Sequence, residues 1–202
     1  MNNQENQFTK QFWTDRYQTK QTGWDAGTIT TPLKEYIDQL RDKKSAILIP
    51  GAGNGHEAEY LFNAGFKNVT VIDISPEPIK NIQKRVPKFN PNNLVLGDFF
   101  EHTGSYDLII EQTFFCALNP PLRKKYVNQM HALLKPAGKL VGVLFIEPLA
   151  AEHPPFGASK EEYTALLSPQ FVIEKLEPCY NSIKPRNGKE LFTVLSKKIN
   201  KG

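Results

Sequence analysis

The chain has 202 residues, of which 40% are hydrophobic and 23% charged, a globular composition at a length suited to one domain. No apolar run reaches the ~20 residues that a membrane-spanning helix needs, and the polar start lacks a secretory signal, so we expect a soluble, cytoplasmic protein without membrane contacts. The net charge of +4 comes without a basic stripe interleaved with aromatic residues, which argues against nucleic-acid binding, and the spacing of Cys116 and Cys179 suggests neither zinc nor a disulfide framework.

The beginning of the chain is polar and then rich in aromatic residues. Residues 1–11 are expected to form a flexible polar terminus, and residues 12–202 a single domain. An aromatic segment runs from Phe12-Trp13 through Tyr17 to Trp24. A helix is expected over about 32–40, because apolar residues recur there at helical spacing.

From residue 46 onward, short apolar runs alternate with amphipathic segments. Strands are expected at 46–49, 69–74, 94–96, 106–110 and 140–146, with helices beginning near Gly55, Pro76 and Pro121. Ser75 suits the N-cap of the helix at Pro76. The alternation predicts an α/β fold, a Rossmann-like, doubly wound and mostly parallel sheet.

The last part of the chain completes this sheet. A Pro-rich loop at 147–157 leads to a short helix at about 159–167. Two further strands are expected at 171–176 and 191–196, and the turn-rich segment between them predicts an antiparallel pair. The predicted sheet is therefore seven-stranded, with an antiparallel C-terminal strand pair.

Three glycines at alternate positions follow the first strand, in Ile47-Leu-Ile-Pro-Gly-Ala-Gly-Asn-Gly-His56. A thin loop between a strand and a helix lets the backbone approach a nucleotide-like ligand at the carboxyl edge of a sheet. The dinucleotide fingerprint has glycine where this chain has His56, so the spacing favours a ligand without a pyrophosphate. S-adenosylmethionine is such a ligand.

Acidic residues follow the second and third strands. Asp73 ends the second strand, where its two oxygens can accept hydrogen bonds from both hydroxyls of a ribose. Asp98 follows the third strand beside Phe99, where it can accept from an adenine amino group while the aromatic ring packs on the base. The alternative is that both carboxylates only cap loop ends.

With these residues assembled, the chain resembles the thiopurine S-methyltransferase family and its thiol and halide methyltransferase relatives. The resemblance runs from about residue 12 to residue 196. It rests on ordered motifs: Phe12-Trp13, Thr22-Gly-Trp-Asp25, Pro50-Gly-Ala-Gly-Asn-Gly-His56, Asp73-Ile-Ser75, Gly97-Asp-Phe-Phe100 and Thr113-Phe-Phe-Cys-Ala-Leu118. It implies the class I methyltransferase fold, S-adenosyl-L-methionine as cofactor with S-adenosyl-L-homocysteine as product, and a thiol or a halide- or thiocyanate-type anion as acceptor.

The resemblance also implies a set of cofactor-binding residues: Trp13, Trp24, Gly51, Gly53, Asp73, Ile74, Asp98, Phe99 and Gln112. Where relatives often have an acidic residue followed by tyrosine, this chain has Glu111-Gln112, and Gln112 is expected to bind the methionine portion. Trp13 and Trp24 are expected to form a lid over the site; the alternative is ordinary helix packing. Phe115 and Phe156 are the candidates for the wall of the acceptor pocket.

No catalytic residue is predicted, because a thiolate or a halide can attack the sulfonium methyl group without a dedicated base. His153 is the one histidine that we consider as a base, and Cys116 is interpreted as a packing residue. Metal ligands are not expected.

Alternative functions stay open from the sequence. They are a nicotinamide-dependent oxidoreductase, a non-catalytic S-adenosylmethionine-binding protein, and a methyltransferase acting on another small molecule or on nucleic acid. For a nucleic-acid methyltransferase the chain lacks an Asn-Pro-Pro-Tyr-like motif, since Asn119-Pro-Pro-Leu122 is expected to cap a helix. The acceptor and the oligomeric state are not given by the sequence, although a chain of this size can act as a monomer.

Overall fold

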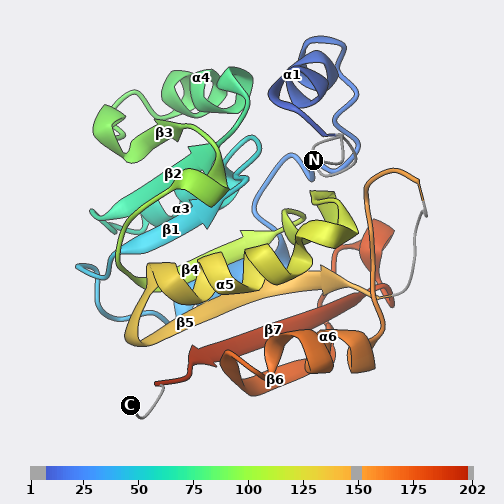
Figure 1. The fold of residues 1–202 in the computed structure, drawn as a ribbon. Helices are drawn as coiled ribbons and strands as arrows, with labels where there is room; N and C mark the ends of the chain where they lie inside the picture. The colour runs from blue at the N-terminus through green and yellow to red at the C-terminus, as the bar shows by residue number, and fades with distance from the viewer. Residues whose placement is uncertain (1–7, 147–151, 200–202) are drawn as a thin grey trace.

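A seven-stranded sheet with the strand order β3-β2-β1-β4-β5-β7-β6 forms the centre of the molecule (Figure 1). The structure, a computed structural model, describes residues 8–146 and 152–199, so most of the predicted flexible terminus and residues 147–151 of the Pro-rich loop lie outside the described residues. The strands are β1 Ile47–Pro50, β2 Val69–Asp73, β3 Leu94–Leu96, β4 Tyr106–Gln112, β5 Leu134–Phe145, β6 Phe171–Pro178 and β7 Glu190–Lys197.

The first five strands are parallel, and β7 runs antiparallel between β5 and β6. The predicted doubly wound sheet with an antiparallel C-terminal pair is therefore confirmed. Chain order reverses between β1 and β4, which is the place where ligands bind in open α/β sheets, beyond the carboxyl ends of the strands.

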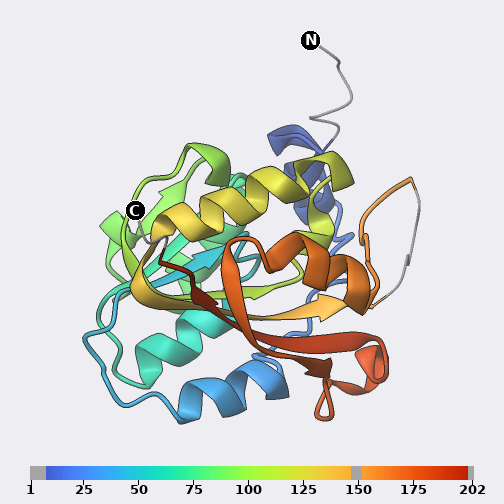
Figure 2. The ribbon, with the colours of Figure 1, turned by 60° about the horizontal axis from the view of Figure 1, so that its bottom comes forward.

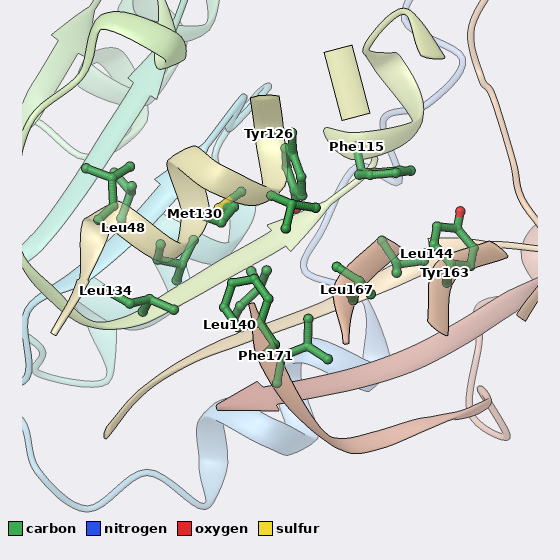
Figure 3. Packing of buried hydrophobic residues seen from close by; sticks show 14 of the residues in the cluster. Leu48, Phe115, Tyr126, Met130, Leu134, Leu140, Leu144, Tyr163, Leu167 and Phe171 are labelled. Atoms are coloured by element: carbon green, nitrogen blue, oxygen red, sulfur yellow. The ribbon is translucent and has the colours of Figure 1, made fainter. Parts of the chain in front are cut away.

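Helices cover both faces of the sheet and enclose two buried apolar clusters. The helices are α1 Lys10–Gln18, α2 Thr31–Asp38, α3 His56–Asn63, α4 Pro76–Arg85, α5 Arg123–Leu133 and α6 Lys160–Leu167. Figure 2 shows α5 and α6 on one face and α2 and α3 on the other. Figure 3 shows the first cluster, in which Tyr126 and Met130 of α5 and Leu167 of α6 lie over Leu140 of β5. Across the sheet, Leu33 and Leu61 belong to the second cluster.

Local sequence signals set the starts of several helices. The Ser75 side chain accepts a hydrogen bond from the Glu77 N–H at 3.4 Å, and Pro76 occupies the first turn of α4, as predicted. Ser159 and Glu162 form a reciprocal capping box at the start of α6. No helix within the described ranges is long and apolar enough to span a membrane.

The expected boundary between α5 and β5 is wrong by several residues. The strand expected at 140–146 begins at Leu134 instead, directly after α5, and the Leu134 backbone is extended (φ −82°, ψ 139°). Pro136 explains the end of the helix here, because a proline removes a helical hydrogen bond and disfavours helical backbone in the residue before it.

The helix α1 was not predicted as a helix, and it lies next to α4 (Figure 1). Thr9 caps it by accepting a hydrogen bond from the Phe12 N–H at 3.3 Å. Its one buried residue is Thr14, whose hydroxyl lies 3.1 Å from the Ser75 hydroxyl. Because a polar residue rather than an apolar stripe faces the body, the hydrophobic periodicity that identifies helices is missing here.

Candidate functional site

A cavity of about 680 Å³ lies at the carboxyl edge of the parallel strands. This volume is within the range of small-molecule and cofactor sites. The cavity wall contains every residue that the sequence predicted for the cofactor: Trp13, Trp24, Gly51, Gly53, Asp73, Ile74, Asp98, Phe99 and Gln112. Residues from separate strand ends and from the N-terminal segment thus meet at one place.

The glycine loop after β1 needs glycine for its backbone. Gly51, Gly53 and Gly55 have φ values of 54°, 53° and 67°, a region that side chains rarely tolerate. A Cβ on Gly51 would come within 2.1 Å of the Phe114 ring, and one on Gly53 would lie 3.4 Å from the Tyr17 hydroxyl oxygen. The loop therefore fits closely beneath aromatic side chains that also line the cavity.

Asp73 at the end of β2 is almost fully buried, with 8% of its surface exposed. Its Oδ1 accepts from the Ser75 N–H at 2.9 Å and its Oδ2 from the Gly53 N–H at 3.2 Å. Burial raises the pKa of Asp73 to about 6, although these N–H groups favour the charged form. Each carboxylate oxygen has a second lone pair, so the loop-capping bonds leave acceptor capacity toward the cavity.

Asp98 follows β3 in the chain and lines the cavity beside that strand. Its Oδ1 accepts from the Phe100 N–H at 2.8 Å and caps the 3-10 turn Phe99–Glu101. Its Oδ2 makes no hydrogen bond to the part of the chain that the structure describes. Phe99 is buried in an edge-to-face contact with Phe114, at 5.1 Å between ring centroids. One oxygen of Asp98 thus remains available beside β3.

Residues 8–30, called the aromatic segment below, cover the glycine loop. The Trp24 ring meets those of Trp13 and Tyr17 edge to face, at centroid distances of 5.5 and 5.7 Å. Burial, and next the nearby Asp73 carboxylate, raise the pKa of Tyr17. This aromatic cluster forms one wall of the cavity.

Polar contacts hold the aromatic segment to several elements of the body. Besides the contact of Thr14 with Ser75, the Arg186 guanidinium donates to the Trp24 carbonyl. The Thr30 hydroxyl donates to Gln112 Oε1 at 2.8 Å. The Gln112 Nε2 is buried and has no hydrogen-bond partner among the described residues, while Gln112 as a residue lines the cavity.

Glu111, one residue earlier in β4, faces the core rather than the cavity. Its Oε2 accepts from the N–H groups of Phe114 and Phe115, at 3.0 and 3.1 Å. Burial raises its pKa to about 7. Gly142 lies opposite in β5, where a Cβ would come within 2.6 Å of the Glu111 carbonyl oxygen. The Glu111 carboxylate thus holds the turn that carries residues 113–117 along the cavity wall.

The predicted acceptor-pocket residues Phe115 and Phe156 do not line the cavity. Phe115 is 1% exposed, because the 3-10 turn Phe115–Ala117 directs its ring into the core, 5.0 Å from the Tyr126 ring centroid. Phe156 is 4% exposed and packs against Phe8, at 5.8 Å between ring centroids. Their neighbours Cys116 and Pro155 line the cavity instead.

Cys116 was expected to be a packing residue, and His153 was the one histidine considered as a base. The Cys116 thiol lines the cavity and donates to the Thr113 carbonyl at 3.3 Å, and burial raises its pKa, so it is a neutral thiol. His153 is exposed and lies outside the cavity wall, which removes the geometric support for a role as base. His56 is the histidine that lines the cavity, and its Nε2 lies 2.8 Å from Asp25 Oδ1.

Two basic residues of the loop before β7, Arg186 and Lys189, also line the cavity and were missed from the sequence. Arg186 is 9% exposed, and its Nη1 lies 3.5 Å from Glu190 Oε1 without a hydrogen bond. Both residues lie in a loop more than 70 positions after Gln112, and no periodic pattern in the sequence predicts that this loop reaches the cavity. Only the fold reveals that it does. Within the described ranges, no three His, Cys, Asp or Glu side chains converge to hold a metal ion.

Comparisons with known proteins agree with this geometry. Residues 8–200 match the sequence model of the family described as "Thiopurine S-methyltransferase (TPMT)". The chain is 28% identical over 185 residues to "Probable thiol methyltransferase 2" of Arabidopsis thaliana, covering 88% of this chain and 81% of that protein. It is 27% identical over 184 residues to "Thiocyanate methyltransferase 1" of the same plant, with the same coverage.

Among solved structures, the fold is similar to that of 1,6-didemethyltoxoflavin-N1-methyltransferase from Burkholderia thailandensis, which was solved with S-adenosylhomocysteine bound. The TM-score is 0.72 at 18% identity, and the match covers 94% of this chain and 87% of the other. At this identity the similarity concerns the fold alone.

Proposed function

Because the chain belongs to the thiopurine S-methyltransferase family, we propose that it transfers a methyl group to a small thiol or to a halide- or thiocyanate-type anion. The family gives the enzyme class: the chain is an S-adenosylmethionine-dependent methyltransferase with the class I fold, and S-adenosylhomocysteine is its product. This class replaces the nicotinamide-dependent oxidoreductase that the sequence left open. The acceptor is our proposal.

The residues around the cavity fit the cofactor in the order in which they occur along the sheet edge. Asp98 after β3 offers a free oxygen for the adenine amino group, and Asp73 at the end of β2 offers acceptors for the ribose hydroxyls. Gln112 at the end of β4 offers an unpaired N–H for the methionine carboxylate. We propose these roles for the three residues, with the aromatic segment as the lid and residues 12–202 as one domain.

When bound, the cofactor supplies a methyl group on a cationic sulfur, ready for in-line displacement. The chain has to hold the acceptor in line and keep water away. The rings of Trp13 and Trp24 cover the cavity and present faces that suit a neighbouring cation. No side chain is proposed as a general base, since a thiolate or a halide ion is already a nucleophile.

The observation that carries the acceptor proposal is the buried guanidinium of Arg186. It lies in the cavity wall with Cys116, Phe145 and Pro155, so a cation stands among apolar, polarisable groups. Burial raises the pKa of its partner Glu190. Lys189, exposed at the rim, adds further positive charge. Such a wall attracts small anions and suits soft nucleophiles.

Turnover of labelled S-adenosylmethionine with a panel of acceptors tests the proposal. We expect methylation of iodide, thiocyanate, hydrosulfide or small thiols, and none of matched alcohols and amines. Arg186→Gln should raise KM for the best anion about tenfold, because a charge-assisted contact is lost. Lys184→Gln, an exposed change in the same loop, should leave KM unchanged. Methylation of neutral acceptors alone would contradict the proposal, and no turnover with any acceptor would favour a non-catalytic role.

The proposal extends to where the enzyme works. A small-molecule acceptor needs neither a membrane nor a nucleic acid, and the two cysteines are free, as in a reducing compartment. We therefore propose a cytoplasmic enzyme that can act as a monomer.

A further inference from the structure

Two carboxylates, Asp25 and Glu57, line the cavity where the glycine loop leads into α3. This end lies beyond Asp73, on the side of β1 and β4, where Gln112 also reaches the cavity. Along the sheet edge it follows the positions that suit adenine and ribose. The methionine portion of the cofactor therefore belongs at this end, with its α-ammonium and its α-carboxylate.

Asp25 has most of its acceptor capacity occupied by protein groups. Its Oδ1 accepts from the Gly27 N–H at 2.8 Å and lies 2.8 Å from His56 Nε2, while Oδ2 accepts from the Asn54 side chain. Burial acts to raise the pKa of Asp25, but these hydrogen bonds bring it below its ordinary value. Asp25 thus fastens the aromatic segment to the glycine loop.

Glu57 is different, because its carboxylate has no hydrogen bond or ion pair with any other residue of the described chain. It is half-buried in the first turn of α3, and burial raises its pKa. The N-terminus of a helix favours an acidic residue in its first turn, but Glu59 already supplies one. Glu59 is also paired with Arg85 at 2.8 Å, whereas Glu57 is not paired within the described chain. Burial outweighs the nearby basic residues His56 and Arg186, which act to lower the pKa of Glu57 without a direct ion pair to it. A carboxylate that faces a cavity without a direct partner suits a cationic ligand group.

We propose that Glu57 binds the α-ammonium of the cofactor's methionine portion, with the buried Gln112 Nε2 facing the α-carboxylate. The two side chains offer an unpaired acceptor and an unpaired donor, which together complement an amino-acid zwitterion. The inference rests on the same methyl donor as the proposed function and is independent of the acceptor.

Calorimetric titration with three probes and no acceptor tests this role. The probes are S-adenosylhomocysteine, its analogue without the α-amino group, and 5′-methylthioadenosine, which has neither charged group. Glu57→Gln should weaken binding of S-adenosylhomocysteine about tenfold or more. Its effect on the other two probes should stay within about twofold. Gln112→Ala should weaken both carboxylate-bearing probes and leave 5′-methylthioadenosine unaffected.

Glu59→Gln is the matched control, because it removes the other acidic residue of the same helical turn from outside the cavity wall. It should leave all three affinities unchanged within about twofold. Equal weakening of all probes by Glu57→Gln, or no weakening, would overturn the proposal while leaving the acceptor assignment intact. Failure of the wild-type protein to bind S-adenosylhomocysteine would overturn both. Thermal unfolding of each variant without ligand shows whether the fold is kept.

Discussion

Glu111 of β4 and Gly142 of β5 are paired in neighbouring strands, and each residue type explains why the other is at its position. The missing side chain of Gly142 leaves room for the Glu111 backbone and Cγ, which a Cβ would approach within 2.6 and 2.9 Å. The carboxylate then reaches the N–H groups of the following turn. A single residue that never touches the cavity thereby shapes part of its wall.

This arrangement makes stability depend on pH. The folded protein raises the pKa of Glu111 from 4.5 to about 7, so its contribution to stability is fully present below pH 4.5 and is lost as pH rises through about 7. Glu111→Gln removes this dependence. Between pH 4.5 and 8, the free energy of unfolding of the wild type should therefore fall relative to the variant by about 3 kcal/mol at most.

Urea unfolding at several pH values measures this difference. Glu161→Gln, an exposed change in α6, should follow the wild-type pH dependence and serves as the control. If the free energy of unfolding changed with pH in the same way for the wild type and Glu111→Gln, burial would not raise the pKa of this carboxyl group.

The candidate site could be predicted from the sequence where residues directly follow strands. Asp73 and Asp98 come to one edge because parallel strands align their carboxyl ends, a rule that needs no side-chain detail. The same rule fails in the turn after β4, where no periodicity shows which of Phe115 and Cys116 faces the cavity. Arg186 was missed because a distant loop brings it to the cavity. Which residues bind the cofactor remains a prediction from their position.

At the scale of elements, the helices with one apolar face could be predicted, and α1 could not. In α2, Leu33 and Ile37 are buried at helical spacing, whereas α1 buries only Thr14. Besides the hydroxyl contact of Thr14, α1 packs through the partly buried Trp13 ring, and such a helix is held less firmly than one docked through an apolar stripe. The aromatic segment is therefore the element whose stability we expect to depend most on the cofactor.

Hydrogen exchange followed by mass spectrometry tests this expectation. S-adenosylhomocysteine should slow amide exchange in residues 10–30 about tenfold or more, because it adds contacts to Trp13 and Trp24. Exchange in α6, which lines no part of the cavity, should not change. Uniform slowing of both regions would indicate global stabilisation instead of ordering of the aromatic segment.

At the scale of the whole molecule, the alternation of strands and helices was enough to predict the sheet. The pattern did not decide which of the last two strands lies beside β5. The structure places β7 there, with Leu191 and Leu195 buried. The edge strand β6 carries Glu174 and Lys175 among its apolar residues, which suits an edge because charges discourage pairing with another chain.

Cofactor binding should stabilise the whole domain. At a concentration of S-adenosylhomocysteine one hundred times its Kd, the free energy of unfolding should rise by about 2.7 kcal/mol, which raises Tm by about 5–10 °C. Differential scanning fluorimetry measures the shift. Asp73→Ala should lose most of it while keeping the far-ultraviolet circular dichroism of the wild type. A full shift in the variant would remove Asp73 from the site.

The contacts of the aromatic segment bear on the speed of the catalytic cycle. They reach α4, the glycine loop, β4 and the loop before β7, so the segment cannot swing aside until bonds to several elements break in one event. Such a concerted opening is slower than the loss of any one bond. With a reactive acceptor, we therefore expect departure of the spent nucleoside, rather than the displacement at carbon, to limit turnover.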